Sequence, residues 1–166
     1  TRKSLPPIDE RISFLMHRVD AQLALICNPV FRHLDVTLHN SRILVLLLEA
    51  TRVKVGDLVT RMVLPQSTIS HQVRELERRK LIRRTPGETD SREIYVELTA
   101  KGKHVAQQCN ALSKDVYDAM VEELSQTDLE RLRAQLCGIF NRLEILKEKK
   151  YSTLRMQRQR KTAKSA

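Results

Sequence analysis

Polar and basic side chains share one face of the segment from residue 66 to residue 79, where they could contact a nucleic acid. Apolar residues recur there at intervals of three and four, at Ile69, Val73 and Leu76, which predicts a helix with one buried face. The opposite face carries Ser67, Ser70, His71, Arg74 and Arg78. Hydroxyl, imidazole and guanidinium groups all bond base edges or phosphate oxygens. The segment therefore has the chemistry of a helix that recognises a nucleic acid.

The neighbouring elements favour this interpretation over that of an ordinary solvated helix. A shorter helix is predicted over residues 55–62, and Leu64-Pro65 interrupts the chain before the helix from residue 66 begins. After that helix, residues 81–85 and 92–98 form two short apolar-alternating runs around a Pro86-Gly87 turn. The order helix, tight turn, helix and hairpin predicts a winged helix-turn-helix module.

Long amphipathic helices are expected on both sides of this module. Apolar residues follow a helical period over residues 8–30, where they make two separate stripes, and a buried helix is expected over residues 40–50. Thr99 can cap a helix over residues 101–123, and Ser125 or Thr127 can open a last helix whose apolar face continues to Leu146. A helix that is apolar on two sides needs a second surface to pack on, which motivates a dimer.

The fold class that we expect is mainly α with a small β-hairpin wing. The predicted organisation is an N-terminal dimerisation helix in residues 1–35, the winged helix-turn-helix in 36–98, C-terminal dimerisation helices in 99–148 and a basic tail in 149–166. Three interpretations of that tail stay open: a solvated extension, a further arm that contacts phosphates, or a disordered end.

The distribution of charge supports the module more than the total charge does. The net charge is +10, but residues 149–166 contain seven Lys and Arg and no acid. Within the body of the chain, residues 52–85 hold nine basic residues and three acidic ones. This local excess coincides with the predicted helix-turn-helix and its first wing strand, as expected for a surface that attracts phosphates.

Three short segments resemble the signature of the MarR family of bacterial transcription regulators, and the resemblance extends over about residues 8–146. They are Leu76-Glu77-Arg78-Arg79-Lys80-Leu81-Ile82-Arg83-Arg84, Asp90-x-Arg92 and Leu98-Thr99-Ala100-Lys101-Gly102. The resemblance implies that the hairpin loop is a wing whose Arg92 enters the minor groove while Asp90 orients it. An arginine suits a narrow, negative groove. One position departs from the family, because Lys80 stands where relatives usually have a glycine that ends the helix.

The resemblance also implies a ligand-responsive repressor that binds a palindromic operator as a homodimer. We expect major-groove contacts from Ser67, Ser70, His71 and Arg74, phosphate contacts from Gln66 and Thr68, and wing contacts from Asp90 and Arg92. A small effector, such as an aromatic acid or its thioester, would release the DNA. Four polar residues near the dimerisation helices could meet an anionic effector, or could be ordinary surface groups, namely Arg18, Gln22, His39 and Arg42.

Other classes of function have less support. The five histidines show no metal-ligand spacing, and the chain has no phosphate loop or nucleophile signature, so we expect no metal, no cofactor and no enzyme. The three cysteines are an odd number without a paired motif, which is typical of reduced thiols in the cytoplasm. No apolar run is long enough to span a membrane. Two alternatives stay open: a thiol-based redox sensor centred on Cys27, and a winged-helix module that does not recognise sequence.

Overall fold

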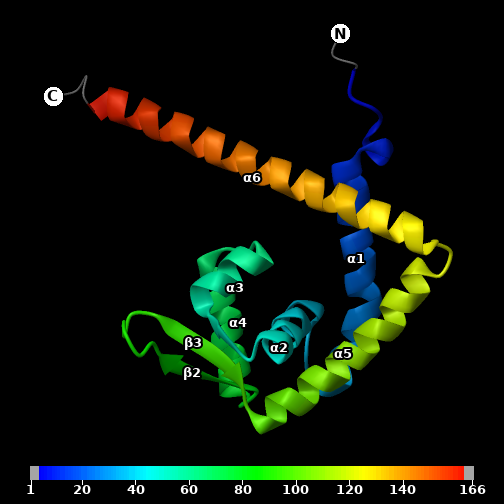
Figure 1. The fold of residues 1–166 in the computed structure, drawn as a ribbon, viewed down its shortest axis with the longest axis vertical. Coiled ribbons are helices and arrows are strands. Elements are labelled where there is room, and N and C mark those ends of the chain that lie inside the picture. Colours follow the sequence, from blue (N-terminus) through cyan, green and yellow to red (C-terminus); the bar gives the residue numbers. More distant parts are fainter. Residues whose placement is uncertain (1–3, 163–166) are drawn as a thin grey trace. The chain divides into compact units, whose positions relative to one another are not determined.

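The computed structural model describes residues 4–162, and the side chains of residues 4–149 (Figure 1). The chain divides into two compact units, one ending at Asp118 and the other beginning at Ala119. In chain order the first elements are η1 (Ile8–Glu10), α1 (Ile12–Phe31), η2 (Arg32–Leu34), α2 (Leu38–Ala50), β1 (Arg52–Lys54) and α3 (Val55–Met62). They are followed by α4 (Gln66–Arg78), β2 (Ile82–Pro86), β3 (Ile94–Leu98), α5 (Ala100–Val121) and α6 (Gln126–Thr162). The predicted fold class, mainly helical with a small hairpin wing, is confirmed.

A three-stranded antiparallel sheet carries the wing. Its strand order is β1-β3-β2, and β3 pairs Val96 with Val53 on one side and with Arg84 on the other. The hairpin of β2 and β3 was predicted from its alternation, but β1 was not. Only Val53 is apolar in this three-residue strand, so the strand is too short to show a period. The missed strand matters because it joins the helix-turn-helix to the wing.

The core of the first unit packs against one face of α4 and holds this helix in place. Ile69, Val73 and Leu76 are buried, as predicted, together with Leu58 of α3 and Val96 of β3. The helices α3 and α4 contact each other, and α4 also contacts β2. Burial of these aliphatic side chains supplies a hydrophobic driving force of about 1.5–3 kcal/mol each. The polar face of α4 is thereby turned outward.

The first predicted helix is divided in the structure. Residues 8–30 were expected to form one helix, but Arg11 adopts an extended conformation, with φ −73° and ψ 127°, between η1 and α1. The Arg11 side chain donates from Nε to the carbonyl oxygen of Pro6 at 3.0 Å. Pro29 lies in the last turn of α1, where the sequence placed the end of the helix.

The second unit contains the last helix, α6, and its cap. Ser125 accepts a hydrogen bond from the amide of Asp128 at 3.2 Å, so the predicted capping residue opens α6. The helix continues to Thr162, beyond the end expected near residue 148, and the first part of the predicted basic tail is therefore helical backbone. Residues 163–166 of that tail lie outside the described residues, as do the side chains from residue 150 onward. No helix in the described part of the chain is long and apolar enough to cross a membrane.

Candidate nucleic-acid interface

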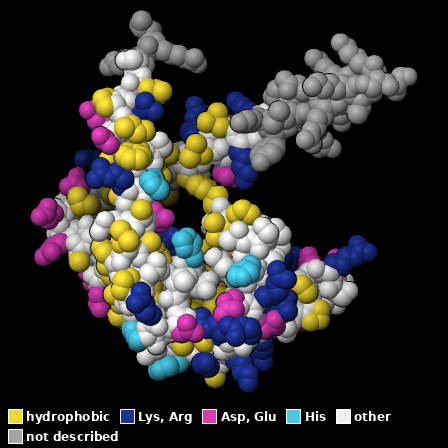
Figure 2. Space-filling model, turned by 180° about the vertical axis from the view of Figure 1, so that it is seen from behind, with side chains coloured by type: hydrophobic (Ala, Val, Ile, Leu, Met, Phe, Trp, Pro, Cys, Tyr) yellow, Lys and Arg dark blue, Asp and Glu magenta, His cyan; other side chains and the backbone are white. Residues whose placement is uncertain are grey.

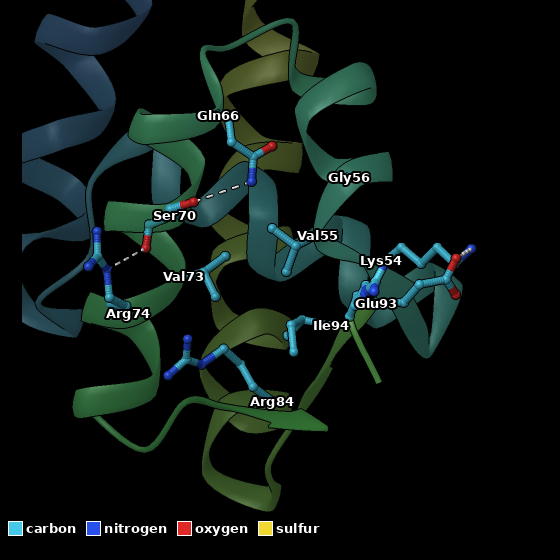
Figure 3. A pocket seen from close by; sticks show the side chains of 11 residues that line it. Lys54, Val55, Gly56, Gln66, Ser70, Val73, Arg74, Arg84, Glu93 and Ile94 are labelled. Atoms are coloured by element: carbon cyan, nitrogen blue, oxygen red, sulfur yellow. Dashed lines mark hydrogen bonds and ion pairs between the residues drawn. The ribbon is translucent and has the colours of Figure 1, made fainter. Parts of the chain in front are cut away.

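All six α4 residues that were expected to contact DNA lie on the solvent side of this helix. Gln66, Ser67, His71 and Arg74 are exposed, while Thr68 and Ser70 are half-buried. Ser70 organises two of its neighbours, because Gln66 donates to its hydroxyl at 3.4 Å and Arg74 donates from Nε to its carbonyl oxygen at 3.1 Å (Figure 3). These bonds hold a long amide and a guanidinium along the exposed face of the helix.

The acidic residues near this face are paired with arginines. Glu75 receives two hydrogen bonds from Arg78, at 2.7 Å and 3.0 Å, and these lower the pKa of its carboxyl below the ordinary value. Glu77 pairs with Arg84 of β2 at 2.6 Å. Carboxylates repel phosphates, and a paired arginine offsets that repulsion locally. Lys and Arg side chains accordingly cluster over the winged module in Figure 2.

A pocket of about 620 Å³ lies between the recognition helix, the start of α3 and the wing (Figure 3). Four cationic side chains from separate elements reach it, namely Lys54 of β1, Arg74 of α4, Arg84 of β2 and Arg92 of the wing loop. Glu93 is the acid among the residues that line it. Gln66 and Ser70 add neutral hydrogen-bonding groups. A concave surface with this charge and these donors is suited to a polyanion.

The wing loop is closed by backbone hydrogen bonds around Asp90. Its carboxylate accepts the amide hydrogen of Arg92 at 2.9 Å, and its carbonyl oxygen accepts the amide of Glu93 at 3.1 Å. Gly87 donates to the carbonyl oxygen of Glu93 at 2.8 Å, and a Cβ on Gly87 would lie 2.6 Å from the carbonyl oxygen of Asp90. The resemblance implied that Asp90 orients Arg92. In the structure the contact between them is made through the Arg92 backbone, and both side chains are exposed.

The C-terminal end of α4 compensates for the missing glycine. Lys80 adopts the left-handed conformation, with φ 59°, at the position where the sequence departs from the family pattern. The amide of Leu81 bonds the carbonyl oxygen of Leu76 at 3.0 Å, and the amide of Lys80 bonds that of Glu77 at 2.8 Å. This is the Schellman arrangement, which satisfies the last carbonyl groups of a helix. The helix ends where predicted, at the steric cost of a side chain in this region.

The four residues considered for effector binding line neither of the two pockets beside the sheet. Arg42 of α2 forms an ion pair with Asp20 of α1 at 3.0 Å, a partner that the sequence did not reveal. Arg18, Gln22 and His39 are exposed. The second pocket, of about 250 Å³, is lined instead by residues around β1, including Arg52 and Tyr95.

The sequence did not reveal that Lys54, Arg84 and Glu93 line this pocket. Arg84 belonged to a basic run that was already noted, so its charge was visible although its place beside α4 was not. Lys54 and Glu93 meet only because β1 pairs with β3, and that pairing had no sequence signal. Among the described residues, no three His, Cys, Asp or Glu side chains are grouped in a way that could hold a metal ion.

Comparison with known proteins agrees with this geometry. A family model described as MarR family matches residues 34–93. The HTH-type transcriptional regulator MgrA of Staphylococcus aureus is 27% identical over 143 residues, which cover 86% of this chain and 96% of MgrA. The structure of the S. aureus MepR-DNA complex matches with a TM-score of 0.74 at 21% identity, covering 80% of this chain and 98% of that chain. A MarR family transcriptional regulator from Silicibacter pomeroyi matches with a TM-score of 0.72 at 25% identity, covering 80% and 89%.

The fold and the basic face of α4 define a winged helix-turn-helix DNA-binding regulator of transcription. Residues 34–93 of the chain match the MarR family model, as the resemblance in sequence indicated. MgrA and the Silicibacter pomeroyi protein, to which the chain is similar, are transcription regulators.

Proposed function

We propose that this protein is a homodimeric repressor that recognises a near-palindromic operator. The observation that carries the proposal is the cationic pocket between α4 and the wing. If α4 lies in a major groove and the wing enters the next minor groove, the sugar-phosphate backbone that separates the two grooves must pass between them. Lys54, Arg74 and Arg84 are then placed beside that backbone, and the proposed site of action is the cytoplasm, where the DNA is.

Within this arrangement each predicted contact has a place. Ser67, His71 and Arg74 face the base edges from the exposed side of α4, and Ser70 joins them from a half-buried position. Gln66 and Thr68, at the N-terminal end of the helix, suit phosphate contacts, because free backbone amides and the helix dipole favour anions there. Arg92 at the wing suits the minor groove.

Exposed apolar stripes on the flanking helices support a dimer. Eight large hydrophobic side chains from Leu5 to Ile26 are at least 40% exposed, and Figure 2 shows such side chains along α1. The helix α6 has its own series of exposed apolar residues, namely Leu132, Leu136, Phe140, Leu143, Ile145 and Leu146. Apolar faces of this extent on a soluble chain are characteristic of protein interfaces. A two-fold dimer would present two recognition helices about 34 Å apart, one DNA turn, to two half-sites.

Regulation by an effector completes the proposal. A small aromatic acid or thioester bound near Arg18, Gln22, His39 or Arg42 would favour a spacing of the recognition helices that does not fit DNA. The Asp20 carboxylate pairs with the Arg42 guanidinium, so an anionic effector at this site would have to displace it. The Asp20→Asn variant should therefore bind such an effector more tightly.

The first experiment is selection of DNA duplexes from a random-sequence pool by the full chain, followed by fluorescence anisotropy near physiological salt. We expect an enriched near-palindrome that binds about 10³-fold more tightly than its scrambled counterpart. Equal affinity for both duplexes would overturn the operator proposal and leave a winged-helix module without sequence recognition, because phosphate contacts alone carry no sequence information.

A pair of variants tests the assigned face. Arg74→Ala removes a cation from the pocket and from the recognition helix, and should weaken binding to the selected duplex by about 5- to 150-fold. Arg142→Ala removes the same charge from an exposed position on α6 and serves as the matched control. Equal losses for the two variants would mean that α4 does not face the DNA.

A further inference from the structure

We propose that Glu93, held by Lys54 and Tyr95, positions the wing so that Arg92 fits the DNA. The inference rests on the proposed function and adds a positioning residue to it. We call the side chains of Arg52, Lys54, Glu93 and Tyr95 the wing brace, because they join β1 to the two ends of the wing loop. None of them was among the residues expected to act on DNA.

Both carboxylate oxygens of Glu93 are engaged within the wing brace. Lys54 approaches Oε1 with its Nζ at 2.6 Å, and Tyr95 donates from its hydroxyl to Oε2 at 3.3 Å. The hydrogen bond to Glu93 is the main cause that raises the pKa of Lys54 above the ordinary value. Figure 3 shows Lys54 and Glu93 meeting at the edge of the cationic pocket. A short charge-assisted bond of this kind fixes the direction of both side chains.

The backbone of Glu93 closes the wing loop at the same point. Its amide bonds the carbonyl oxygen of Asp90, and its carbonyl oxygen accepts the amide of Gly87. Gly87 has no Cβ, and one placed there would lie 3.3 Å from both the Glu93 Cβ and the Tyr95 ring. Glu93 is thus held through its backbone and its side chain. Arg92 is the preceding residue, so a planar peptide bond transmits any displacement of Glu93 to it.

A second arm of the wing brace fixes the other end of the loop. The Arg52 guanidinium lies over the Tyr95 ring at 4.4 Å from its centroid. It also contacts Thr85 and Glu88, each at 3.4 Å. Arg52 and Lys54 belong to β1, which leads directly into α3 of the helix-turn-helix. The wing brace therefore sets the separation between the wing and the DNA-recognition module.

The position of Glu93 is difficult to explain by charge or by stability. An acid that lines a cationic, DNA-facing pocket lowers its attraction for phosphates. Partly exposed ion pairs also contribute little to the free energy of folding. The side chains of Lys54 and Glu93 are 37% and 35% exposed. A role in orienting the wing accounts for an acid in this place.

The Glu93→Gln variant distinguishes positioning from charge because the two effects have opposite signs. Loss of an acid should strengthen binding to any DNA, whereas loss of wing orientation should weaken binding to the selected operator. We expect the ratio of affinities for the selected and scrambled duplexes to fall by about tenfold. An equal rise in the affinity for both duplexes would overturn the proposal. Glu49→Gln, with the same charge change at an exposed position of α2 outside the wing brace, should leave the ratio unchanged.

Two further variants test the pair itself. Lys54→Glu should lower the affinity ratio, and the charge-reversed pair Lys54→Glu with Glu93→Lys should recover it at the original net charge. Adding Arg92→Ala to Glu93→Gln should cost much less than Arg92→Ala costs alone, since the wing contact is already lost. A double variant no better than Lys54→Glu, or fully additive losses with Arg92→Ala, would contradict the positioning role.

Hydrogen exchange of the free protein separates a failure of the wing brace from a failure of the proposed function. The amides of Gly87 and Glu93 should exchange faster in Glu93→Gln than in Glu49→Gln, because the loop they close is released. If wild-type protein shows no sequence preference, the operator proposal fails, and the exchange rates still report on the wing brace. If these two amides exchanged at the wild-type rate in Glu93→Gln, the proposed role of the wing brace would be overturned, whichever DNA the protein binds.

Discussion

The thiol of Cys27 lies in the core near the end of α1, with an exposed fraction of 3%. Burial raises its pKa above the ordinary value, and the positive charge of Arg42 offsets part of that rise. A redox-sensing cysteine is normally an accessible thiol with a lowered pKa, because the thiolate is the reactive form. These surroundings favour the interpretation of Cys27 as a small apolar core residue over that of a sensor.

Alkylation measures this property of Cys27 directly. In folded protein near neutral pH, Cys27 should react with iodoacetamide at least about 100-fold more slowly than in urea-unfolded protein, since reaction requires local opening. Mass spectrometry of the modified peptides reports each cysteine separately in the same sample. Similar rates in the folded and unfolded states would restore the redox-sensing alternative.

Cys109 of α5 predicts an alkaline loss of stability. This thiol is fully buried, and desolvation raises its pKa from 9.0 to about 11. The unfolded chain therefore releases the proton first, and the free energy of unfolding falls as pH rises through this interval. Between about pH 8 and about pH 10, wild-type protein should lose about 1.3 kcal/mol more than Cys109→Ala. Urea unfolding at both pH values measures the difference, and parallel losses would mean that the thiol ionises as readily in the fold as in the unfolded chain.

At the scale of elements, a helix or strand could be predicted from the sequence when its apolar residues repeated over enough positions to show a period. The helices α3 and α4 and the wing hairpin were placed from the sequence because each repeats its apolar period several times. The strand β1 has one apolar residue, and its partner β3 lies about forty positions later, so only the tertiary structure reveals it. The exposed face of α4 was therefore visible in the sequence, whereas the pocket and the wing brace were not.

The start of α5 depends on a glycine at position 102. A Cβ there would lie 1.7 Å from the carbonyl oxygen of Leu81, which is backbone and cannot rotate away. Thr99 accepts the amide of Gly102 at 2.9 Å and donates to the carbonyl oxygen of Lys80 at 2.7 Å, so helix cap and close approach occur together. Gly102→Ala should lower the free energy of unfolding by more than about 3 kcal/mol. Gly138→Ala, where nothing lies within 4 Å of the added Cβ, is the matched control and should not destabilise the protein in urea.

The end of the recognition helix is tied to the corner between α1 and α2. The Arg79 side chain is only 14% exposed, and its Nη2 contacts the carbonyl oxygen of Leu34 at 3.2 Å and the Asp35 carboxylate at 3.0 Å. Arg79→Met keeps the aliphatic stem but removes the donor, and should cost about 1–2 kcal/mol in urea unfolding. Asp35→Asn should change little, because that carboxylate is 88% exposed. If Asp35→Asn lowered the free energy of unfolding more than Arg79→Met did, the stabilising contact would be the ion pair and not the hydrogen bond to the Leu34 carbonyl oxygen.

At the scale of the whole molecule, the main feature is that the flanking helices α1 and α6 expose large apolar side chains. The sequence showed two stripes over residues 8–30 and one long stripe in the last helix, and these were expected to need a partner. In the chain as described, Leu25 is 70% exposed and Leu143 is 56% exposed. A period in the sequence identifies which side of a helix is apolar, but it does not identify the surface that covers it. That is why the partner copy stays a proposal while the helices themselves are established.

A charge placed on the α6 stripe tests the dimer and its connection to DNA binding together. Leu143→Glu should shift the protein toward monomer, because a dimer would have to bury an unpaired carboxylate. A monomer presents one recognition helix, so the affinity for the full operator should approach that for a single half-site. Asn141→Glu adds the same charge at an exposed polar position of α6 and should leave both properties unchanged. Sedimentation equilibrium and anisotropy on the same samples give the two readings, and a Leu143→Glu variant that stays dimeric would place the interface elsewhere than on this stripe.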